Sequence, residues 1–380
     1  MRESLLRDVR QSNVIGRLNR LTRGDAKLTE FAFTYHLSSS ADEPSTAISF
    51  SVKPDSIPPT NVHVLIGRNG VGKTRCMRQL ALALLGRKDN IEQTSSVVMN
   101  PSFMGDNAEF SGLILVSFSA FDEFELRPVE SDLMRCQQVG LKSPASSIGP
   151  SRAKNFEDLG RDFADSLERC QSGVLAERWR TAVQALEEDD LFAEADVTSL
   201  LNQSEDVESG LKNKATKIFK KLSSGHAIVL LTVTRLVELV DERTLVLLDE
   251  PEGHLHPPLL ASFIRCLSDL LIRRNGVAIV ATHSPVVLQE VPKICAWKLR
   301  RSGRTAIAER PTIETFGENI GVLTREVFGL QVTHSGFHRL LQNAVSDGCQ
   351  YQTAIAKFNG QLGDEAKAII QSLISNRDEG

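Results

Sequence analysis

Residues 67–74 read Gly67-Arg68-Asn69-Gly70-Val71-Gly72-Lys73-Thr74 and match the P-loop pattern G-x-x-x-x-G-K-[ST] in full. The glycines of this pattern let the backbone curl so that its N–H groups point at phosphate oxygens. Lys73 supplies a cation for the outer phosphates, and the Thr74 hydroxyl is placed to bind Mg²⁺. The sequence therefore predicts a nucleotide site, whose expected contacts are Arg68, Asn69, Gly70, Val71, Gly72, Lys73, Thr74 and Arg75.

The residues on both sides of this loop support the prediction. Val62–Ile66 is a short apolar run with β-branched residues, which is typical of a strand. A strand that leads through glycines into a helix places phosphates at the helix N-terminus, where anions are favoured. After the loop, apolar residues do recur at helical spacing, at Met77, Leu80, Ala81, Leu84 and Leu85.

A second run, Thr244–Glu250, is an apolar strand that ends in two carboxylates and is followed by Pro251. Its continuous apolar character predicts a central strand of a parallel sheet. Two adjacent acids are common by chance, but two acids at the end of such a strand are not. Asp249 can hold the Mg²⁺ shell through water, and Glu250 can polarise the attacking water.

Two shorter segments extend the pattern. Leu222–His226 precedes an apolar helix expected over 227–240, and Ser and Gly at the opening of a helix form a further anion site. Ser-Ser-Gly alone is usually only a helix cap, but its position shortly before the acidic strand favours a role at the nucleotide.

Val277–Ala281 predicts another buried strand, which is followed by Thr282-His283-Ser284-Pro285. His283 therefore stands where a sensor of the γ-phosphate would, although a His at a strand end is usually a polar loop residue.

This order of motifs resembles the ATP-binding-cassette (ABC) class of P-loop ATPases, over about residues 29–300. It is most similar to the soluble branch that includes chromosome-maintenance and double-strand-break-repair ATPases. Asp249–Pro257 resembles the D-E-P-E-x-x-L-H-P run of soluble members, with His256 where transporters usually carry Asp. The remaining motifs correspond as follows: Gly67–Thr74 is similar to Walker A, Leu222–His226 to the signature motif, Leu245–Glu250 to Walker B and His283 to the switch histidine.

A narrower resemblance is to the ATPase subunit of Septu-type antiphage defence, which is also found with some retrons. It is carried by Ser117–Asp122, by the His-Leu-His-Pro-Pro run at 254–258 and by Thr315–Asn319. That family pairs its ATPase with a separate HNH nuclease. The resemblance therefore implies an HNH nuclease partner, and DNA or a reverse transcriptase–noncoding RNA complex as a further partner.

The ABC resemblance implies ATP sites shared between subunits, and hence at least a homodimer. ATP and Mg²⁺ at the P-loop of one subunit are expected to be capped by Ser223, Ser224 and Gly225 of another. Thr74 and Asp249 are then the expected Mg²⁺ ligands. The expected catalytic residues are Lys73, which neutralises phosphate charge, Glu250, which orients water, and His283, which reads the γ-phosphate.

Two positions depart from the ABC pattern. Cassette ATPases usually carry a Gln after the strand that here is Leu113–Ser117; Ser119 or Asp122 stands in that region, and the nearest downstream Gln is Gln137. The last signature residue is His226, where Gln or Glu is usual. Both departures favour slow turnover, or ATP held as a structural clamp.

The sequence is also compatible with two alternatives to a defence subunit. The first is a DNA-repair or chromosome-maintenance ATPase, which has the same chemistry and a different client. The second is a scaffold that binds ATP without hydrolysing it. A transporter motor is disfavoured by His256.

Composition limits the class of protein further. No apolar run reaches the eighteen or so residues of a membrane span, and Glu3 and Asp8 argue against a transit peptide. The six cysteines form no C-x-x-C pair, so reduced thiols without a zinc site are expected. The net charge of −4 gives no overall attraction to nucleic acid. We expect a cytoplasmic protein without a membrane partner.

The fold expected from these patterns is α/β: an ABC-type P-loop NTPase with a mixed central sheet, an antiparallel N-terminal sheet and an inserted helical lobe. Residues 1–124 would form the β subdomain and P-loop core, and 125–221 the helical lobe that leads to the signature motif. Residues 222–304 would form the Walker B and switch half. The mainly helical region 305–380 is expected to contribute to nuclease contact.

Several local expectations follow. Phe31–His36 and Ala47–Val52 should pair as antiparallel strands, and the polar region 125–155 should be a long loop. From Phe156 to Leu186 an apolar stripe predicts helices that bury Val174 among others. Two basic clusters, Lys212–Lys221 and Arg300–Arg304, are read as a solvated helix face and a hairpin turn, or alternatively as contacts for phosphate or an acidic partner.

Overall fold

The computed structural model describes residues 29–36, 47–86, 96–99, 110–118, 134–143, 152–201, 208–302, 305–329, 336–345 and 349–378. The chain divides into two compact units, residues 1–318 and residues 319–380.

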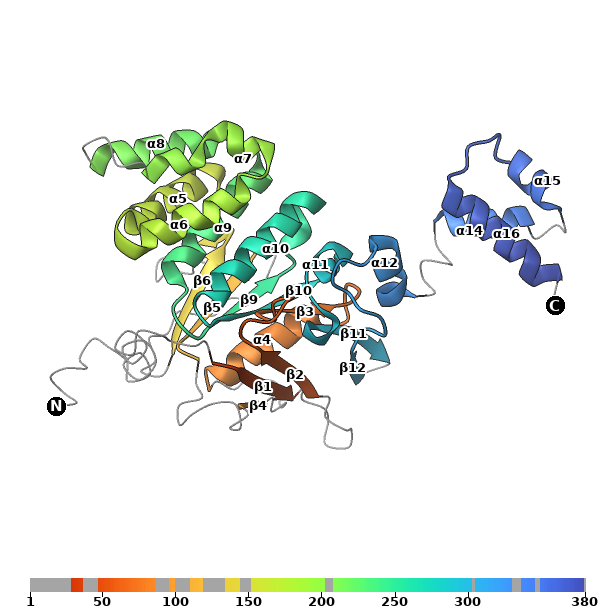
Figure 1. Ribbon diagram of the computed structural model, residues 1–380, viewed down its shortest axis with the longest axis horizontal. Helices are drawn as coiled ribbons and strands as arrows, with labels where there is room; N and C mark the ends of the chain where they lie inside the picture. Colours follow the sequence, from red (N-terminus) through yellow and green to blue (C-terminus); the bar gives the residue numbers. More distant parts are fainter. Residues whose placement is uncertain are drawn as a thin grey trace. The chain divides into compact units, whose positions relative to one another are not determined.

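A seven-stranded mixed sheet forms the centre of the first unit, in the order β12-β11-β3-β10-β9-β5-β6 (Figure 1). Neighbouring strands are parallel except for the antiparallel pair β11–β12. The three central strands are buried along their whole length, as expected where a parallel sheet is covered on both faces. The strands are β3 (Val62–Ile66), β5 (Gly112–Ser117), β6 (Arg135–Gly140), β9 (Thr244–Asp249), β10 (Val277–Thr282), β11 (Ala296–Ser302) and β12 (Thr305–Glu309). The α/β class and the mixed central sheet expected from the sequence are confirmed.

The strand register brings the ends of three strands to the same edge of the sheet. Asp249 at the end of β9 is level with Ala281 of β10, and Thr282 is level with Ile66 of β3. The chain leaves β3 into the P-loop, β9 into Glu250 and β10 into His283. Because parallel strands direct their carboxyl ends to one side, segments far apart in sequence meet there.

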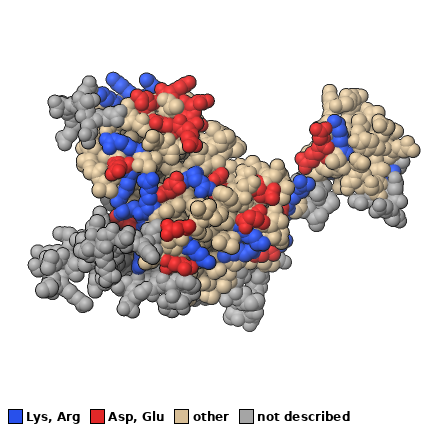
Figure 2. Space-filling model, viewed as in Figure 1, with Lys and Arg blue, Asp and Glu red and all other residues tan. Residues whose placement is uncertain are grey.

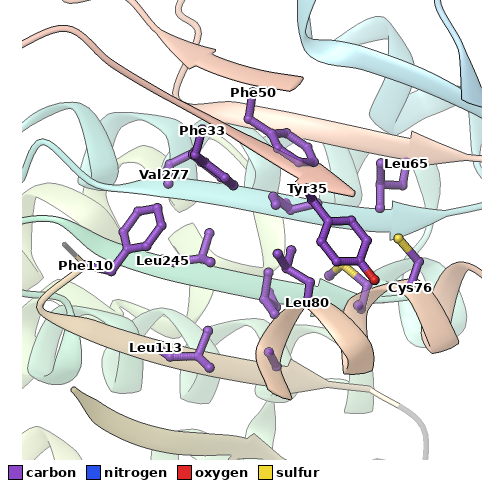
Figure 3. Close-up of a cluster of buried hydrophobic side chains, with 14 of the residues drawn as sticks. Phe33, Tyr35, Phe50, Leu65, Cys76, Leu80, Phe110, Leu113, Leu245 and Val277 are labelled. Atoms are coloured by element: carbon purple, nitrogen blue, oxygen red, sulfur yellow. The ribbon is translucent and has the colours of Figure 1, made fainter. Parts of the chain in front are cut away.

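A separate antiparallel sheet of β2 (Ala47–Val52), β1 (Phe31–His36) and β4 (Ser96–Met99) confirms the expected N-terminal sheet. Its apolar face shares one core with helix α4 (Lys73–Leu84) and with the central sheet, as Figure 3 shows. Phe33 stacks on Phe50 with ring centroids 4.8 Å apart and meets Phe110 edge-on at 5.2 Å. Cys76, Met77, Leu80 and Ala81 of α4 are buried in the same core, which holds the helix that begins at Lys73 against the sheet.

The helical lobe follows β8 (Arg152–Ala153), which pairs with β7 (Lys142–Ser143). Helix α5 (Phe156–Cys170) starts with a capping box, in which the side chains of Asn155 and Asp158 each accept from the other residue's backbone N–H. Trp179 of the lobe is fully buried, and its indole N–H donates to the Thr234 hydroxyl at 2.9 Å. This bond joins the lobe to α9 (Ser224–Leu239), the helix that the signature segment opens. The helices are α5 (Phe156–Cys170), α6 (Gly173–Leu186), α7 (Asp190–Ala195), the 3₁₀ helix η3 (Val197–Leu201), α8 (Glu208–Lys221) and α9 (Ser224–Leu239).

Two local expectations are corrected. The region 125–155 is not wholly a loop, because Arg135–Gly140 is the edge strand β6 and pairs in parallel with β5. Its polar residues Arg135 and Gln137 are exposed, whereas Cys136 and Val139 are buried. In the helical stripe, Phe156 and Val174 are exposed, since each lies at the first or second residue of its helix.

Part of each basic cluster can be placed in the structure. Lys212 forms ion pairs with Asp165 and Glu168, and Lys220 with Glu157, so part of this run neutralises the neighbouring α5. The second cluster lies at the β11–β12 hairpin, whose last pair is Ser302 with Thr305. On the face shown in Figure 2, positive and negative side chains occur side by side over the helical lobe.

The second unit contains α12 (Ile320–Phe328), α14 (Phe337–Val345), α15 (Tyr351–Ala356) and α16 (Asp364–Asp378). The last three share a small core of Leu341, Val345, Ala354, Ala366 and Ile370. Among the described residues of both units, no helix combines the length and apolar character needed to cross a membrane.

Candidate functional site

The P-loop connects the buried strand β3 to helix α4. Gly70 and Gly72 have φ values of 80° and 101°, in the left-handed region that only glycine adopts without strain. Gly67 has the carbonyl of Leu299 directly over its Cα, so no side chain would fit there. These backbone demands explain the three glycines of the motif before any ligand is considered.

Lys73 begins α4 and is almost fully buried, with 4% of its surface exposed. Its ammonium group donates to the carbonyls of Gly67 and Arg68, at 3.1 and 3.2 Å. The lysine is therefore held inside the curve of its own loop. This is where a phosphate group would be enclosed by the loop's N–H groups.

Glu250 lies at the centre of the candidate site. Its Oε1 is 3.3 Å from the Lys73 ammonium and 3.8 Å from Nδ1 of His283. Its backbone has φ 44°, a left-handed conformation that is unfavourable for a residue with a side chain, and its N–H donates to Ala281 at 2.9 Å. The strained turn directs the carboxylate from β9 toward both the P-loop and the end of β10.

Glu252 is a residue whose role the sequence interpretation missed, although it lies inside the acidic run noted there. Its Oε1 accepts from the Thr282 hydroxyl at 2.6 Å and from the backbone N–H of His283 at 2.7 Å. The same oxygen is 3.1 Å from Nδ1 of His283. A nearly buried carboxylate thus fixes the end of β10 and orients the imidazole.

Asp249 is buried at the end of β9, and Thr74 is half-buried in the first turn of α4. A carboxylate and a hydroxyl are hard oxygen donors, which is the donor type that Mg²⁺ prefers. The residues present therefore fit the ion that the motif implies.

The signature segment opens helix α9. Ser223 is the N-cap residue and accepts from the His226 N–H at 3.4 Å, and both Ser223 and Ser224 are exposed. Gly225 is buried, and a Cβ on it would lie 2.6 Å from the carbonyl oxygen of His254. Ser223 thus contacts His226, and Gly225 lies against the segment that follows Glu250.

The structure brings together the three expected catalytic residues, since Glu250 is the partner of both Lys73 and His283. The loop residues Arg68, Asn69, Gly70, Val71 and Gly72 directly precede Lys73, and Arg75 is exposed on α4. Ser119 and Asp122, the positions considered in place of the missing Gln, lie outside the described residues.

Comparison with known proteins gives a family and a close relative. Residues 75–289 match the family model described as "AAA domain, putative AbiEii toxin, Type IV TA system". Protein ea59 of Escherichia phage lambda is 42% identical over an alignment 398 residues long, which covers 99% of this chain and 74% of ea59.

Two solved structures are also similar, each at 14% identity. One is described as an inward-facing conformation of a putative metal-chelate type ABC transporter (TM-score 0.38, covering 78% of this chain and 88% of that one). The other is the ADP conformation of an ATP-binding cassette of an ABC transporter (TM-score 0.33, covering 69% and 85%). These scores are too low to carry an argument about function.

Proposed function

This chain belongs to the AAA-domain family of P-loop ATPases, and on that premise we propose that it is the ATP-binding and ATP-hydrolysing subunit of an antiphage defence complex. In this proposal the chain acts as a homodimer or larger oligomer, shares its ATP sites between copies and controls a separate HNH nuclease. The observation that carries the ATPase part is the convergence of Lys73, Glu250 and His283 at the ends of three parallel strands.

Phosphoryl transfer to water depends mainly on positioning and on stabilising charge. Lys73 would neutralise the outer phosphates, and Glu250 would orient the attacking water. His283, held by Glu252, would contact the γ-phosphate. Thr74 and Asp249 would hold Mg²⁺, which supplies positive charge to the phosphate oxygens.

A shared site is supported by the exposure of Ser223 and Ser224 at the start of α9. Hydroxyl groups and free N–H groups at a helix N-terminus favour an anion. In the proposed dimer this anion is the γ-phosphate of ATP bound to the other copy, as the ABC resemblance implies.

The nuclease partner is proposed because the sequence has motifs for an ATP site and none of the HNH type. The Septu resemblance supplies the pairing of such an ATPase with a nuclease. The ea59 relative is a phage protein, and a phage-borne gene that acts against competing phages fits the same proposal.

Mixing two inactive variants tests the shared site. Lys73→Ala removes the lysine of one P-loop, and Ser223→Ala alters the signature segment without touching the P-loop. A mixed dimer contains one intact composite site, so a 1:1 mixture should recover about one quarter of wild-type phosphate release if a two-fold dimer forms at random. A mixture as inactive as its components, from variants that still dimerise, would refute shared sites.

Copurification tests the partner. The chain should capture an HNH protein encoded beside its gene, and phage challenge should activate cleavage only when Lys73 is intact. An intact complex that cleaves equally with Lys73→Ala would remove ATP from nuclease control.

One observation favours a second candidate, an ATP-bound scaffold without turnover. His226, which stands where the signature motif usually ends in Gln or Glu, is buried and bound to Ser223 and Asp189 of its own chain. The scaffold predicts a protein that retains ATP through purification and releases no phosphate, whereas the ATPase predicts bound ADP and steady release.

A further inference from the structure

Three metal-ligating side chains from separate segments meet beside the start of α9. Asp189 precedes α7, His226 lies in the first turn of α9, and His256 precedes α10 (Pro257–Ile272). One ligand atom from each lies within 4.8 Å of those of the other two. Nε2 of His226 is 2.9 Å from Oδ1 of Asp189, and Nε2 of His256 is 4.0 Å from Oδ2.

The surroundings orient these groups toward one another. The Ser223 hydroxyl oxygen is 2.6 Å from Nδ1 of His226, and the Leu191 N–H donates to Oδ1 of Asp189 at 3.0 Å. The Phe192 ring packs edge-on against His226, with centroids 5.0 Å apart. His226 is 3% exposed, whereas half of the His256 side chain is exposed, so the cluster has a buried base and one side open to solvent.

The position of the ring proton on His226 decides whether its Nε2 donates to Asp189 or presents a lone pair to it. If Nδ1–H of His226 donates to Ser223, Nε2 presents a lone pair to the Asp189 carboxylate. Two acceptors 2.9 Å apart repel unless a proton or a metal ion lies between them. Metal-ligating histidines usually donate their other ring N–H to an oxygen acceptor, and the Ser223 hydroxyl oxygen is positioned to accept from Nδ1 of His226.

We propose that Asp189, His226 and His256 form a binding site for a divalent transition-metal ion, of which Zn²⁺ is the best fit. Two imidazole nitrogens and one carboxylate oxygen match the donor preference of Zn²⁺, rather than the all-oxygen sets of Mg²⁺ or Ca²⁺. Ligand atoms in a tetrahedral zinc site lie roughly 3.3 Å apart, given metal–ligand bonds of about 2.0–2.2 Å. Nε2 of His226 is 2.9 Å from Oδ1 of Asp189 and Nε2 of His256 is 4.0 Å from Oδ2, so the half-exposed His256 would move slightly for one oxygen to complete the set.

Binding exchanges protons for the metal. Any proton between Nε2 of His226 and Asp189 is released to solvent, because both atoms must offer lone pairs. Nδ1 of His256 accepts from the Leu259 N–H at 3.3 Å, and this long bond is given up when Nε2 binds the ion and Nδ1 carries the ring proton. A fourth metal position would be filled by water or by an external ligand.

The site would connect two parts of the ATPase that the nucleotide must coordinate. His226 is the last residue of the signature segment Leu222–His226, and His256 ends the segment that begins at Glu250. The ion would thus lock the signature helix to the Walker B segment, and Asp189 would attach the helical lobe to both. None of the three ligands is among the residues proposed to contact the nucleotide, and the proposal does not depend on hydrolysis.

Zinc titration of the chelator-stripped full-length chain tests the proposal. Isothermal titration in the presence of a competing chelator should give one strong Zn²⁺ site per chain. Asp189→Asn and His256→Gln should each weaken binding by at least tenfold, since each removes a ligand; both replacements keep a side-chain oxygen for helix capping. The matched control is His254→Gln, whose imidazole bonds to the Phe118 carbonyl instead, and it should bind as wild type does.

Zinc-edge X-ray absorption of the wild-type protein gives a second reading that needs no variant. The expected shell has two imidazole nitrogens with oxygen ligands and no sulfur. Sulfur ligands, the absence of a strong site, or unchanged affinity in the folded Asp189→Asn/His256→Gln double variant would each overturn the proposal.

Discussion

The ammonium of Lys73 and the carboxylate of Glu250, 177 residues apart in sequence, form an ion pair of 3.3 Å at the mouth of the P-loop. The carboxylate of Glu250 balances the charge of Lys73, which is nearly buried. A phosphate that enters the loop competes with Glu250 for this cation. Binding of the nucleotide would therefore release the carboxylate at the moment when it is needed to orient water.

Glu250→Gln tests that role. A glutamine keeps the size of the side chain but is a poor base, so the variant should bind Mg-ATP and lose phosphate release by about 10²–10⁴-fold. Binding should not weaken, because the competitor for Lys73 has lost its charge. Equilibrium binding and phosphate release measured on the same preparation separate the two effects.

The matched control is Glu177→Gln, on the exposed face of α6, which should leave both quantities unchanged. A Glu250→Gln variant as active as an active wild type would remove Glu250 from the mechanism.

Lys73→Ala should weaken ATP binding by about 100-fold or more, because charge-assisted hydrogen bonds contribute roughly 1.5–3 kcal/mol each. The fold should persist, since the residue's described partners are its own loop carbonyls and Glu250. Lys53→Ala, at an exposed position, provides the control. Wild-type affinity in a folded Lys73→Ala protein would show that nucleotide binds elsewhere.

The parts of the site that the sequence predicted are those encoded by short-range patterns. The glycine spacing of the P-loop and the apolar run before Asp249 each specify a local structure, and the parallel strand order then brings them together. The strand β6 was not predicted, because Arg135–Gly140 lacks a clear alternation and is a strand through its pairing with β5.

Contacts set by tertiary packing were also missed. Asp189 lies 37 residues before His226 in a polar segment, and no spacing rule links the two. Glu252 was visible in the acidic run, yet its hold on His283 depends on the turn at Glu250. Sequence patterns identify elements, but the side chains that orient catalytic groups depend on how those elements pack.

Gly225→Ala should destabilise the protein by a steric mechanism. The new Cβ would lie 2.6 Å from the His254 carbonyl oxygen. Because that oxygen belongs to the backbone, relieving the clash requires a shift of the chain that costs free energy. We expect the free energy of unfolding to fall by about 1–3 kcal/mol, as for other overpacked sites. Denaturant unfolding measures this quantity directly.

Gly210→Ala is the matched control, because it lies in α8 with no atom within 4 Å of the new Cβ. It should raise stability by about 0.5–1 kcal/mol through helix propensity. Equal effects at both glycines would contradict the close packing of the signature segment on His254.

Removing residues 336–380 tests the role of the second unit. The helices α14–α16 bury a core of their own, so the truncated chain should keep ATP binding. We expect it to lose capture of the nuclease, because the region is proposed to contribute to that contact. Undiminished capture by a folded truncated chain would assign docking to the first unit.

The last prediction concerns the stability of the helical lobe in acid. Glu238 on α9 accepts from the Ser166 hydroxyl at 2.6 Å and from Arg235 at 2.9 Å, and it pairs with Arg169. Burial raises the pKa of Glu238, but the hydrogen bonds from Arg169 and Ser166 and the charge of Arg235 outweigh it. The net pKa lies below the ordinary value of 4.5.

A carboxylate whose pKa is lowered by folding stabilises the native state above its unfolded pKa, and this contribution is lost as pH falls through the folded pKa. Wild type should therefore exceed Glu238→Gln in free energy of unfolding at pH 7, and the difference should shrink as pH falls below about 4.5. Urea unfolding at a series of pH values measures both curves. Glu177→Gln should follow wild type throughout, and a Glu238→Gln deficit that stays constant down to pH 3 would mean that the ion pairs of Glu238 do not set this pH dependence.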